Sequence, residues 1–212
     1  LNRAATVFPN SAEAILRIGS HDLLEPDRKS AAWNMPLRRI YPDAPRGSGV
    51  IEFNPSLVLR NRAQHRLDTM HQAMSGYAPS SMRGVGDVAD HEFMHQVDFN
   101  SGGILRRVAP LLSEYSRKVD NEAVATAGQH WLSTGSSWDP NVIRIVTPGE
   151  IPALGDQFSG FVDFGNGLAS VSPEDYLHRR EQAFLFDNIL SSIQKNQMTP
   201  LEPEDLRVEL AE

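Results

Sequence analysis

Two histidines and a glutamate lie within residues 91–95, His-Glu-Phe-Met-His, which form an HExxH pattern. On a helix, His91 and His95 lie one turn apart on the same face, where both imidazoles can bind a single metal ion. Glu92 lies beside them, and its carboxylate can take a proton from a metal-bound water. We therefore predict one zinc ion per chain, with Glu92 as the general base. Because protons compete with zinc for histidine, the metal should be lost in acid.

The residues around the pattern predict the helix that it requires. Ala89, Phe93 and Val97 recur every four residues and form an apolar stripe on the side away from the histidines. Asp87 is the predicted N-cap, and residues 100–103, Asn-Ser-Gly-Gly, form a stop signal. We expect a helix that buries this stripe and presents the histidines on its opposite side.

A catalytic zinc site of this kind uses three protein ligands and leaves a fourth position for water. The chain has no cysteine, so the third ligand must be His, Glu or Asp. In the HExxHxxGxxH pattern the third histidine falls six positions after the second, but here that position holds Ser101, and Asp98 replaces the glycine. The gluzincin arrangement, with a glutamate on a later helix, remains.

Two glutamates are candidates for this third ligand. Glu122 opens a segment of small residues, 121–128, that would let two helices approach closely, as a shared ligand requires. Considered alone, it is explained more simply as a first-turn carboxylate that offsets the helix dipole. Glu181 stands beside Arg179 and Arg180 and is explained more simply as a solvated acid next to an apolar stripe. The residues by themselves leave both candidates open.

Two segments resemble one known family. Residues 91–98, His-Glu-Phe-Met-His-Gln-Val-Asp, are similar to the HEFGHxVD helix of the anthrax-lethal-factor-like zinc peptidases and of related zincin domains in phage minor head and polyvalent proteins. Residues 113–127 resemble that group's later segment, S-x-Y-x5-6-E-x-x-A-x-A, with Tyr115 seven positions before Glu122. More loosely, residues 49–54 are similar to the substrate-edge strand of zincins. From Gly128 onward the resemblance has no specific motif.

The resemblance implies roles for particular residues. It makes His91, His95 and Glu122 the zinc ligands and Glu92 the base, and it makes Tyr115 a hydrogen-bond donor to the developing oxyanion.

The chain also departs from the family pattern in two places. Met94 replaces the usual small residue and is expected to narrow the space beside the metal, and the linker at residues 99–113 is shorter than in lethal factor. Related domains carry a Y-x-x-R-x-E-x-x-F segment that resembles residues 176–184, which keeps Glu181 as the rival ligand.

Length and composition are those of one soluble globular domain. The 212 residues are 40% hydrophobic and 22% charged, and no apolar run approaches the ~20 residues that span a bilayer. The net charge of −7, with Lys and Arg scattered, argues against nucleic-acid binding. We expect a zincin-like domain at residues 1–195 and an extended acidic tail at 196–212. Because the first residue is Leu1, we expect a fragment or a processed product.

Local patterns predict the elements that position these residues. In the first third of the chain we expect strands at 4–8 and 36–41, a helix from residue 10 to about 21, and an edge strand at 49–54. A helix at 57–74 is expected to bury Leu59, Leu67 and Met70. After the HExxH segment we expect helices at 104–119, 121–132 and 173–194, with short strands at 142–146 and 157–164. The candidate core positions of the first of these helices are Leu105, Val108, Leu111 and Leu112.

Two further polar residues have alternative interpretations. Asp98 lies about one turn after His95 and is either the acceptor of that ring's free N–H or a plain acid on the helix surface. His130 comes eight positions after Glu122 and is interpreted as a structural histidine rather than a ligand.

Together these patterns predict an α+β fold with a zincin-like arrangement: a small twisted sheet with an edge strand, an HExxH helix beneath it and a helical C-terminal half. The predicted function is zinc-dependent hydrolysis of peptide bonds in a protein or peptide substrate, without nucleic-acid or membrane partners. The alternative is a structural phage virion domain within a larger assembly, which keeps the fold and cleaves little or nothing. A toxin-type peptidase secreted into a host cell, with one host substrate, is the third hypothesis.

Overall fold

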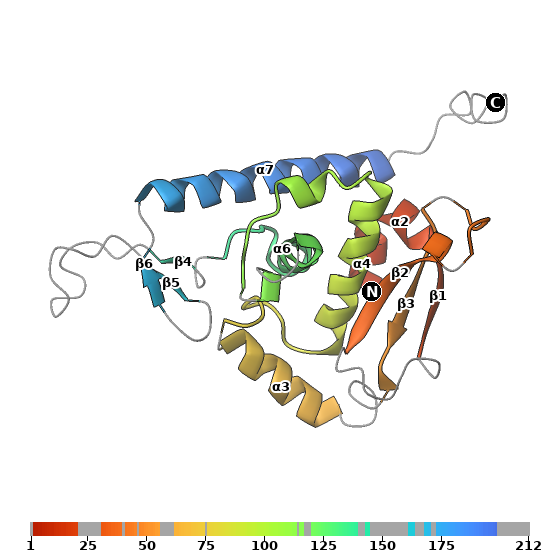
Figure 1. The fold of residues 1–212 in the computed structure, drawn as a ribbon, viewed down its shortest axis with the longest axis horizontal. Helices are drawn as coiled ribbons and strands as arrows, with labels where there is room; N and C mark the ends of the chain where they lie inside the picture. Colours follow the sequence, from red (N-terminus) through yellow and green to blue (C-terminus); the bar gives the residue numbers. More distant parts are fainter. Residues whose placement is uncertain are drawn as a thin grey trace, which may run out of the picture.

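A computed structural model describes residues 2–20, 31–39, 41–45, 47–55, 62–74, 76–113, 115–116, 120–139, 143–144, 161–163, 168–170 and 173–198. The fold is α+β, as predicted, with a small mixed sheet beside a group of helices (Figure 1). The helices are α1 (Asn2–Val7), α2 (Pro9–Glu13), α3 (Arg62–Met74), α4 (Val85–Asn100), α6 (Asp120–Thr134) and α7 (Pro173–Met198), with 3₁₀ turns at Leu37–Arg39 and Leu105–Arg107. The strands are β1 (Ile15–Ser20), β2 (Ala32–Pro36), β3 (Gly49–Phe53), β4 (Ile143–Arg144), β5 (Phe161–Asp163) and β6 (Leu168–Ser170).

The sheet beside α4 has the strand order β1-β3-β2. β3 pairs in parallel with β1 and antiparallel with β2, so it is the central strand. The prediction that residues 49–54 form an edge strand is therefore wrong, although the strand itself exists. The edge strand next to α4 is β2 (Figure 1). The second sheet, β4-β5-β6, is antiparallel throughout.

Helix α4, which carries the HExxH pattern, lies between the sheet and α6 (Figure 1). Phe93, Met94 and Val97 are buried in the main hydrophobic core, but so are polar residues on the other sides of the helix, including Asp90, Glu92 and Gln96. The expectation of a helix buried on one side only is therefore wrong. α4 is a central helix, and its polar residues must find partners inside the protein.

Glycine at position 49 lets the sheet approach α4 closely. A Cβ atom added to Gly49 would lie 2.0 Å from the Gln96 Oε1 atom. The Gln96 side chain also reaches the Gly47 carbonyl and lies 3.4 Å from the Asn34 Nδ2 atom. A side chain at position 49 would collide with the Gln96 amide and displace it from the Gly47 carbonyl and from Asn34.

The start of the chain differs most from the sequence prediction. Residues 4–8, predicted as a strand, lie in and after α1, and the helix predicted from residue 10 stops at Glu13. Ile15 then begins β1 rather than continuing the helix, because a run of apolar residues suits either structure and pairing with β3 decides between them. The strand predicted at 36–41 is also displaced, since β2 ends at Pro36.

Two of the predicted helices are wrong in part. Helix α3 forms, but Leu67 and Met70 are exposed and Thr69 is its buried residue, while Leu59 lies outside the described part of the chain. In the stretch 104–119 only a 3₁₀ turn precedes residue 110, where proline disfavours a continuous helix. Leu105 and Leu112 are nevertheless buried in the main core.

The later helices follow their predictions. α6 covers the predicted 121–132, and α7 covers 173–194 and packs through Ala183, Phe186 and Leu190, whose spacing places them on one face. β4 and β5 lie within the stretches predicted as strands, and the rest of those stretches lies outside the described residues. α7 continues to Met198, so the prediction that an extended tail begins at residue 196 is wrong, and the tail from residue 199 lies outside the described residues. Within the described part of the chain, no helix has the length and apolar character needed to cross a membrane.

Candidate metal centre

His91 and His95 lie on neighbouring turns of α4 and face the same space. Their ring centroids are 5.2 Å apart, and the ring planes meet at 89°, edge to face. His91 is buried and His95 is partly buried, because α6 and the segment containing Tyr115 cover this side of the helix. The i, i+4 spacing thus produces the pair of imidazoles that the sequence predicts.

Glu122 joins this pair from the first turn of α6. Its Oε2 atom lies 2.9 Å from the His91 Nε2 atom and 3.7 Å from the His95 Nε2 atom. The ligand atoms of the three residues all lie within 4.8 Å of one another, in a cluster that could hold a metal ion. Glu181, the rival candidate, is an exposed residue of α7 and is not part of this cluster.

Small residues on α6 allow this approach. A Cβ atom added to Gly128 would lie 2.5 Å from the Met94 Cε atom and 2.7 Å from its Cγ atom, so the Met94 side chain lies directly against the α6 backbone. Met94 therefore fills the contact between α4 and α6 and is not among the residues that line the cavity beside the cluster. That it narrows the space beside the metal stays a prediction. Ala125 and Ala127 are fully buried in the same helix.

The charges of the cluster favour a carboxylate facing two imidazoles. Burial by itself would raise the pKa of Glu122, but hydrogen bonding and positive charge from His91 and His95 outweigh burial and hold that pKa well below its usual range. Burial would lower the pKa of His95, but its interaction with Glu122 and the nearby Glu92 and Asp98 carboxylates raises it above the ordinary value. Positive charge on the two neighbouring histidines therefore stabilises the ionised form of Glu122.

Glu92 is buried between α4 and the edge of the sheet. Burial raises the pKa of its carboxyl, and the nearby Glu122 raises it further, while His91, His95 and the backbone of Asn34 act in the opposite direction. The Asn34 side chain also donates a hydrogen bond to the Glu92 carbonyl oxygen at 3.1 Å, which ties β2 to α4. A carboxyl with a raised pKa next to candidate metal ligands is suited to accepting and returning a proton.

Tyr115 lies beside the His91 ring. Its ring centroid is 6.0 Å from that of His91 and 5.7 Å from that of Tyr77. The backbone N–H of Tyr115 donates to the Tyr77 carbonyl at 3.0 Å and fixes the segment in place. Burial and then the neighbouring Glu122 carboxylate raise the pKa of Tyr115, so its hydroxyl keeps its proton at neutral pH.

A cavity of about 320 Å³ adjoins the cluster. His91, Glu92 and Tyr115 line part of its wall, and the other lining residues come from the start of β2, the end of α3, the loop that precedes α4 and the first turn of α4. The candidate ligands and the candidate base thus border a space large enough for a side chain of another molecule.

In the described part of the chain, no hydrogen bond joins the Asp98 carboxylate to the His95 ring, so the first of its two predicted roles is not observed. Its carboxylate accepts hydrogen bonds from the Arg106 side chain at 2.9 and 2.6 Å and from the Arg106 backbone N–H at 3.2 Å. Asp98 instead fixes the chain that leaves α4.

The Nδ1 atom of His91 is buried without a hydrogen-bond partner among the described residues.

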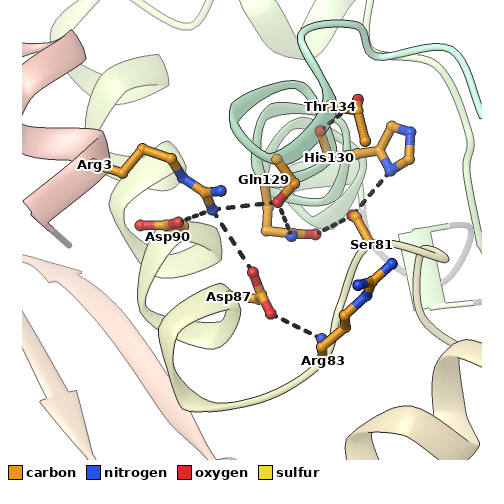
Figure 2. Close-up of polar contacts among 9 residues, drawn as sticks. Arg3, Ser81, Arg83, Asp87, Asp90, Gln129, His130 and Thr134 are labelled. Atoms are coloured by element: carbon orange, nitrogen blue, oxygen red, sulfur yellow. Dashed lines mark hydrogen bonds and ion pairs between the residues drawn. The ribbon is translucent and has the colours of Figure 1, made fainter.

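The sequence gives no sign of the role of Arg3, which Figure 2 shows beside α4 and α6. The Arg3 guanidinium pairs with Asp90, lies 3.7 Å from the Asp87 carboxylate and donates to the Ser133 hydroxyl at 3.2 Å. Arg3 thereby links α1 to both helices that carry the cluster. No local pattern could predict a contact between residues 87 positions apart.

Asp87 is not the N-cap of α4. The N-cap is Gly84, and Asp87 accepts a hydrogen bond from the Arg83 backbone N–H at 2.8 Å from within the first turn (Figure 2). A carboxylate at this position satisfies a free N–H near the helix start in place of a capping side chain.

His130 is a buried residue of α6 outside the cluster, as predicted. The Ser81 hydroxyl donates to the Gln129 side-chain oxygen at 3.2 Å, and the His130 Nδ1 atom lies 2.9 Å from the same hydroxyl oxygen (Figure 2). Burial lowers the pKa of His130, although Asp139, the Trp138 backbone and Asp187 act in the opposite direction. His130 holds the loop before α4 against α6.

Comparisons with the profiles of protein families, with curated proteins and with solved structures give no match for this chain. What the cluster does must therefore be inferred from its geometry and chemistry.

Proposed function

We propose that this chain is a zinc-dependent peptidase of the gluzincin type, with a zincin-like arrangement of α4, α6 and the sheet. One observation carries the proposal: the HExxH histidines converge with a carboxylate from a second helix, while the glutamate between them borders the same cavity. The resemblance of residues 91–98 and 113–127 to the lethal-factor-like zinc peptidases supports it.

His91, His95 and Glu122 would hold the metal. Two imidazole nitrogens and one carboxylate oxygen are the donor set of many catalytic zinc sites. The fit rests on the two Nε2 atoms that both point toward Glu122 Oε2, and on donor atoms that lie within 4.8 Å of one another. Bound there, zinc would supply a Lewis acid that lowers the pKa of a coordinated water to about 7.

Glu92 would act as the general base and then as the general acid. It is adjacent to His91 in the sequence, borders the cavity and is absent from the ligand cluster, so its carboxylate is available for proton transfer. Its raised pKa brings the carboxyl nearer to the pH at which a group can both take a proton from the attacking water and return it to the leaving amine.

Tyr115 would stabilise the charge that develops on the carbonyl oxygen of the cleaved bond. Its raised pKa keeps the hydroxyl protonated, and a protonated hydroxyl can donate a hydrogen bond to that oxygen. Its place in the cavity wall beside His91 brings it to the same space as the base.

The outer edge of β2 would align an extended substrate. Among the described residues, β2 pairs only with β3, which leaves its other edge without a strand partner. Ala31 and Ala32 at the start of this strand line the cavity that His91 and Glu92 border. An extended peptide can add to such an edge through backbone hydrogen bonds.

Metal analysis combined with an activity assay tests the proposal. We expect about one zinc per chain after reconstitution, and cleavage of an unstructured protein substrate that a chelator abolishes and added zinc restores. The analysis should include iron, since two histidines and a carboxylate also bind Fe(II). Absence of bound zinc after reconstitution, or cleavage that persists in the chelator, would refute the proposal.

A further inference from the structure

A second cavity lies between α1, the start of α4 and the end of α6, apart from the metal centre. Its volume is about 450 Å³, a size common among sites for small molecules. Among the described residues, it shares no lining residue with the cavity beside the metal centre or with the cluster of candidate ligands. Ser80, Ser81 and Arg83 line this second cavity, whereas apolar residues of the same loop line the other one. A molecule bound here would not touch the candidate metal ligands.

The wall of the second cavity is polar and carries charges of both signs. Arg3 and Arg83 supply guanidinium groups, and Asp87 and Asp139 supply carboxylates. Burial lowers the pKa of His130, which also lines the cavity, so its ring is neutral at neutral pH. An ion of one sign would meet a like charge in this wall, whereas a ligand that carries both charges can place each one beside its opposite.

Some of these charged groups already have partners within the protein. The Arg3 guanidinium pairs with the buried Asp90 carboxylate and donates to the Ser133 hydroxyl (Figure 2). Asp139 is only 1% exposed, and its carboxylate accepts a hydrogen bond from the Ser80 backbone N–H at 3.2 Å. These two residues therefore shape the wall more than they offer contacts to a ligand.

Arg83 and Asp87 keep polar groups that can bind a ligand. The Arg83 side chain is exposed, and its guanidinium makes no hydrogen bond or ion pair with another described residue, although its backbone N–H donates to Asp87 Oδ2 (Figure 2). Asp87 Oδ1 accepts no hydrogen bond from the described residues, and the Arg3 Nη2 atom lies 3.7 Å from it. The Ser133 hydroxyl accepts hydrogen bonds from Arg3 and Gln129 and keeps its own proton to donate. A cationic donor and a carboxylate oxygen thus border one space.

We propose that this cavity binds a small zwitterion, a free amino acid or a short peptide, with its carboxylate against Arg83 and its ammonium group against Asp87. A guanidinium can hold a carboxylate through two parallel hydrogen bonds, and an ammonium group has three donors for carboxylate oxygens. The Ser133 hydroxyl donates a further hydrogen bond to the ligand carboxylate, and Trp138 lines the volume left for a side chain. The proposal does not depend on the peptidase function, since none of these residues belongs to the metal centre.

Titration with zwitterions of increasing charge separation tests the proposal. Glycine, diglycine and triglycine are added to the isotope-labelled, zinc-reconstituted protein, and its backbone amide resonances are followed by NMR. We expect at least one of the three to bind with a dissociation constant of about 1 mM or lower and to shift the resonances of Ser80, Ser81 and Arg83. The tightest of the three distinguishes a free amino acid from a peptide. Shifts confined to the residues of the metal centre would overturn the assignment.

Removing one charge from the ligand should weaken its binding. The N-acetylated form of the tightest ligand lacks the ammonium group, and the C-amidated form lacks the carboxylate. We expect each form to bind at least ~10-fold more weakly, the scale of a lost hydrogen bond between charged groups. If the N-acetylated form binds as tightly as the free ligand, the cavity recognises an anion alone, and the proposal is wrong.

Replacing each charged residue should remove the effect of the matching ligand charge. Arg83→Gln should weaken binding of the zwitterion at least ~10-fold and make its affinity insensitive to amidation, as expected for two groups in direct contact. Asp87→Asn should make the affinity insensitive to N-acetylation, while its amide oxygen can still accept the Arg83 backbone N–H. Arg66→Gln, the same change at an exposed position of α3, is the matched control and should leave binding unchanged.

The variants also define the results that contradict the proposal. Arg83 is exposed, so its replacement should leave the fold intact, and a change in affinity can be assigned to the lost contact. Absence of binding by all three zwitterions, or an affinity that neither Arg83→Gln nor Asp87→Asn alters, would overturn the assignment of the cavity. Either result would leave the proposed peptidase function untouched, because zinc binding and cleavage are measured separately.

Discussion

Glu92 and the three candidate ligands lie close together but have different electrostatic surroundings. Hydrogen bonds and charge from the histidines hold the pKa of Glu122 low, so it stays an anion that can bind a cation. Burial raises the pKa of Glu92, so it can exchange a proton. Two carboxylates within one small site thus suit two different roles.

Replacing Glu92 with Gln should abolish proton transfer and leave the metal in place. We expect Glu92→Gln to lower peptidase activity by at least ~10²-fold, the scale of lost general-base catalysis. Zinc content and the circular dichroism spectrum should match those of the unchanged protein, because Glu92 is outside the cluster of donor atoms. Loss of zinc from this variant would instead identify Glu92 as a ligand.

Replacing Glu122 and Glu181 in parallel separates the two candidate ligands. Glu122→Gln should weaken zinc binding by more than the roughly 10–100-fold typical for loss of a partner outside the ligand set. Glu181→Gln should leave zinc affinity unchanged, since Glu181 is exposed on α7 and absent from the cluster. Titration with a competing chelator measures both affinities, and the reverse order of effects would exchange the roles of the two residues.

At the scale of elements, the site depends on how closely α4 and α6 approach each other. α4 carries both histidines and Glu92, the proposed base, and α6 carries the Glu122 carboxylate. The Met94 side chain lies directly against Gly128 where the two helices meet, and neither residue belongs to the cluster. A change at this contact should therefore alter the metal site without touching a ligand.

Gly128→Ala tests this dependence. Its new Cβ atom would meet the Met94 side chain at 2.5–3.1 Å, so the helices must separate or Met94 must move. We expect a loss of about 1–3 kcal/mol in the free energy of unfolding, typical of an overpacked core, together with weaker zinc binding. Denaturant unfolding and metal titration provide the measurements.

Gly86→Ala is the matched control, because nothing lies within 4 Å of its new Cβ atom and alanine favours the helix. Adding Met94→Ala to Gly128→Ala should recover part of the lost zinc affinity. If Gly128→Ala leaves both stability and zinc binding unchanged, the contact does not control the separation of the helices.

Arg3 contributes at the same scale by joining α1 to α4 and α6. In Arg3→Ala the largely buried Asp90 carboxylate loses a charged partner, so we expect a loss of about 1–3 kcal/mol in the free energy of unfolding. Arg66→Ala, at an exposed position of α3, should change the free energy by less than about 0.5 kcal/mol. Equal effects in the two variants, measured by denaturant unfolding, would show that the Arg3 contacts do not hold these helices together.

For the molecule as a whole, a metal bound between α4 and α6 should stabilise the fold. A ligand that binds only the folded state adds about 2.7 kcal/mol at a free concentration 100 times its dissociation constant. For a chain of 212 residues this corresponds to a rise in Tm of roughly 5–10 °C. Calorimetry with and without zinc measures the shift. The His91→Ala variant should show no rise, and an equal rise in both proteins would mean that zinc binds elsewhere.

Those parts of the structure that depend on the local spacing of residues can be predicted from the amino-acid sequence. The i, i+4 separation of His91 and His95 places them on one helix face wherever that helix is packed. The periodicity of α7 and the small residues of α6 likewise predict helices and a close helix contact, because both properties belong to short stretches of chain. The α+β class follows from the same local patterns.

Other features depend on residues far apart in the chain, and these become visible only in the folded protein. Pairing with β3 makes β1 a strand rather than a helix and places β3 at the centre of the sheet, so β2 becomes the edge beside the site. Packing on several sides buries the polar residues of α4, which a helix pattern would leave on the surface. The ion pair of Arg3 with Asp90 has no local pattern at all, since the contacts that a side chain makes are fixed by the neighbours that the fold brings to it.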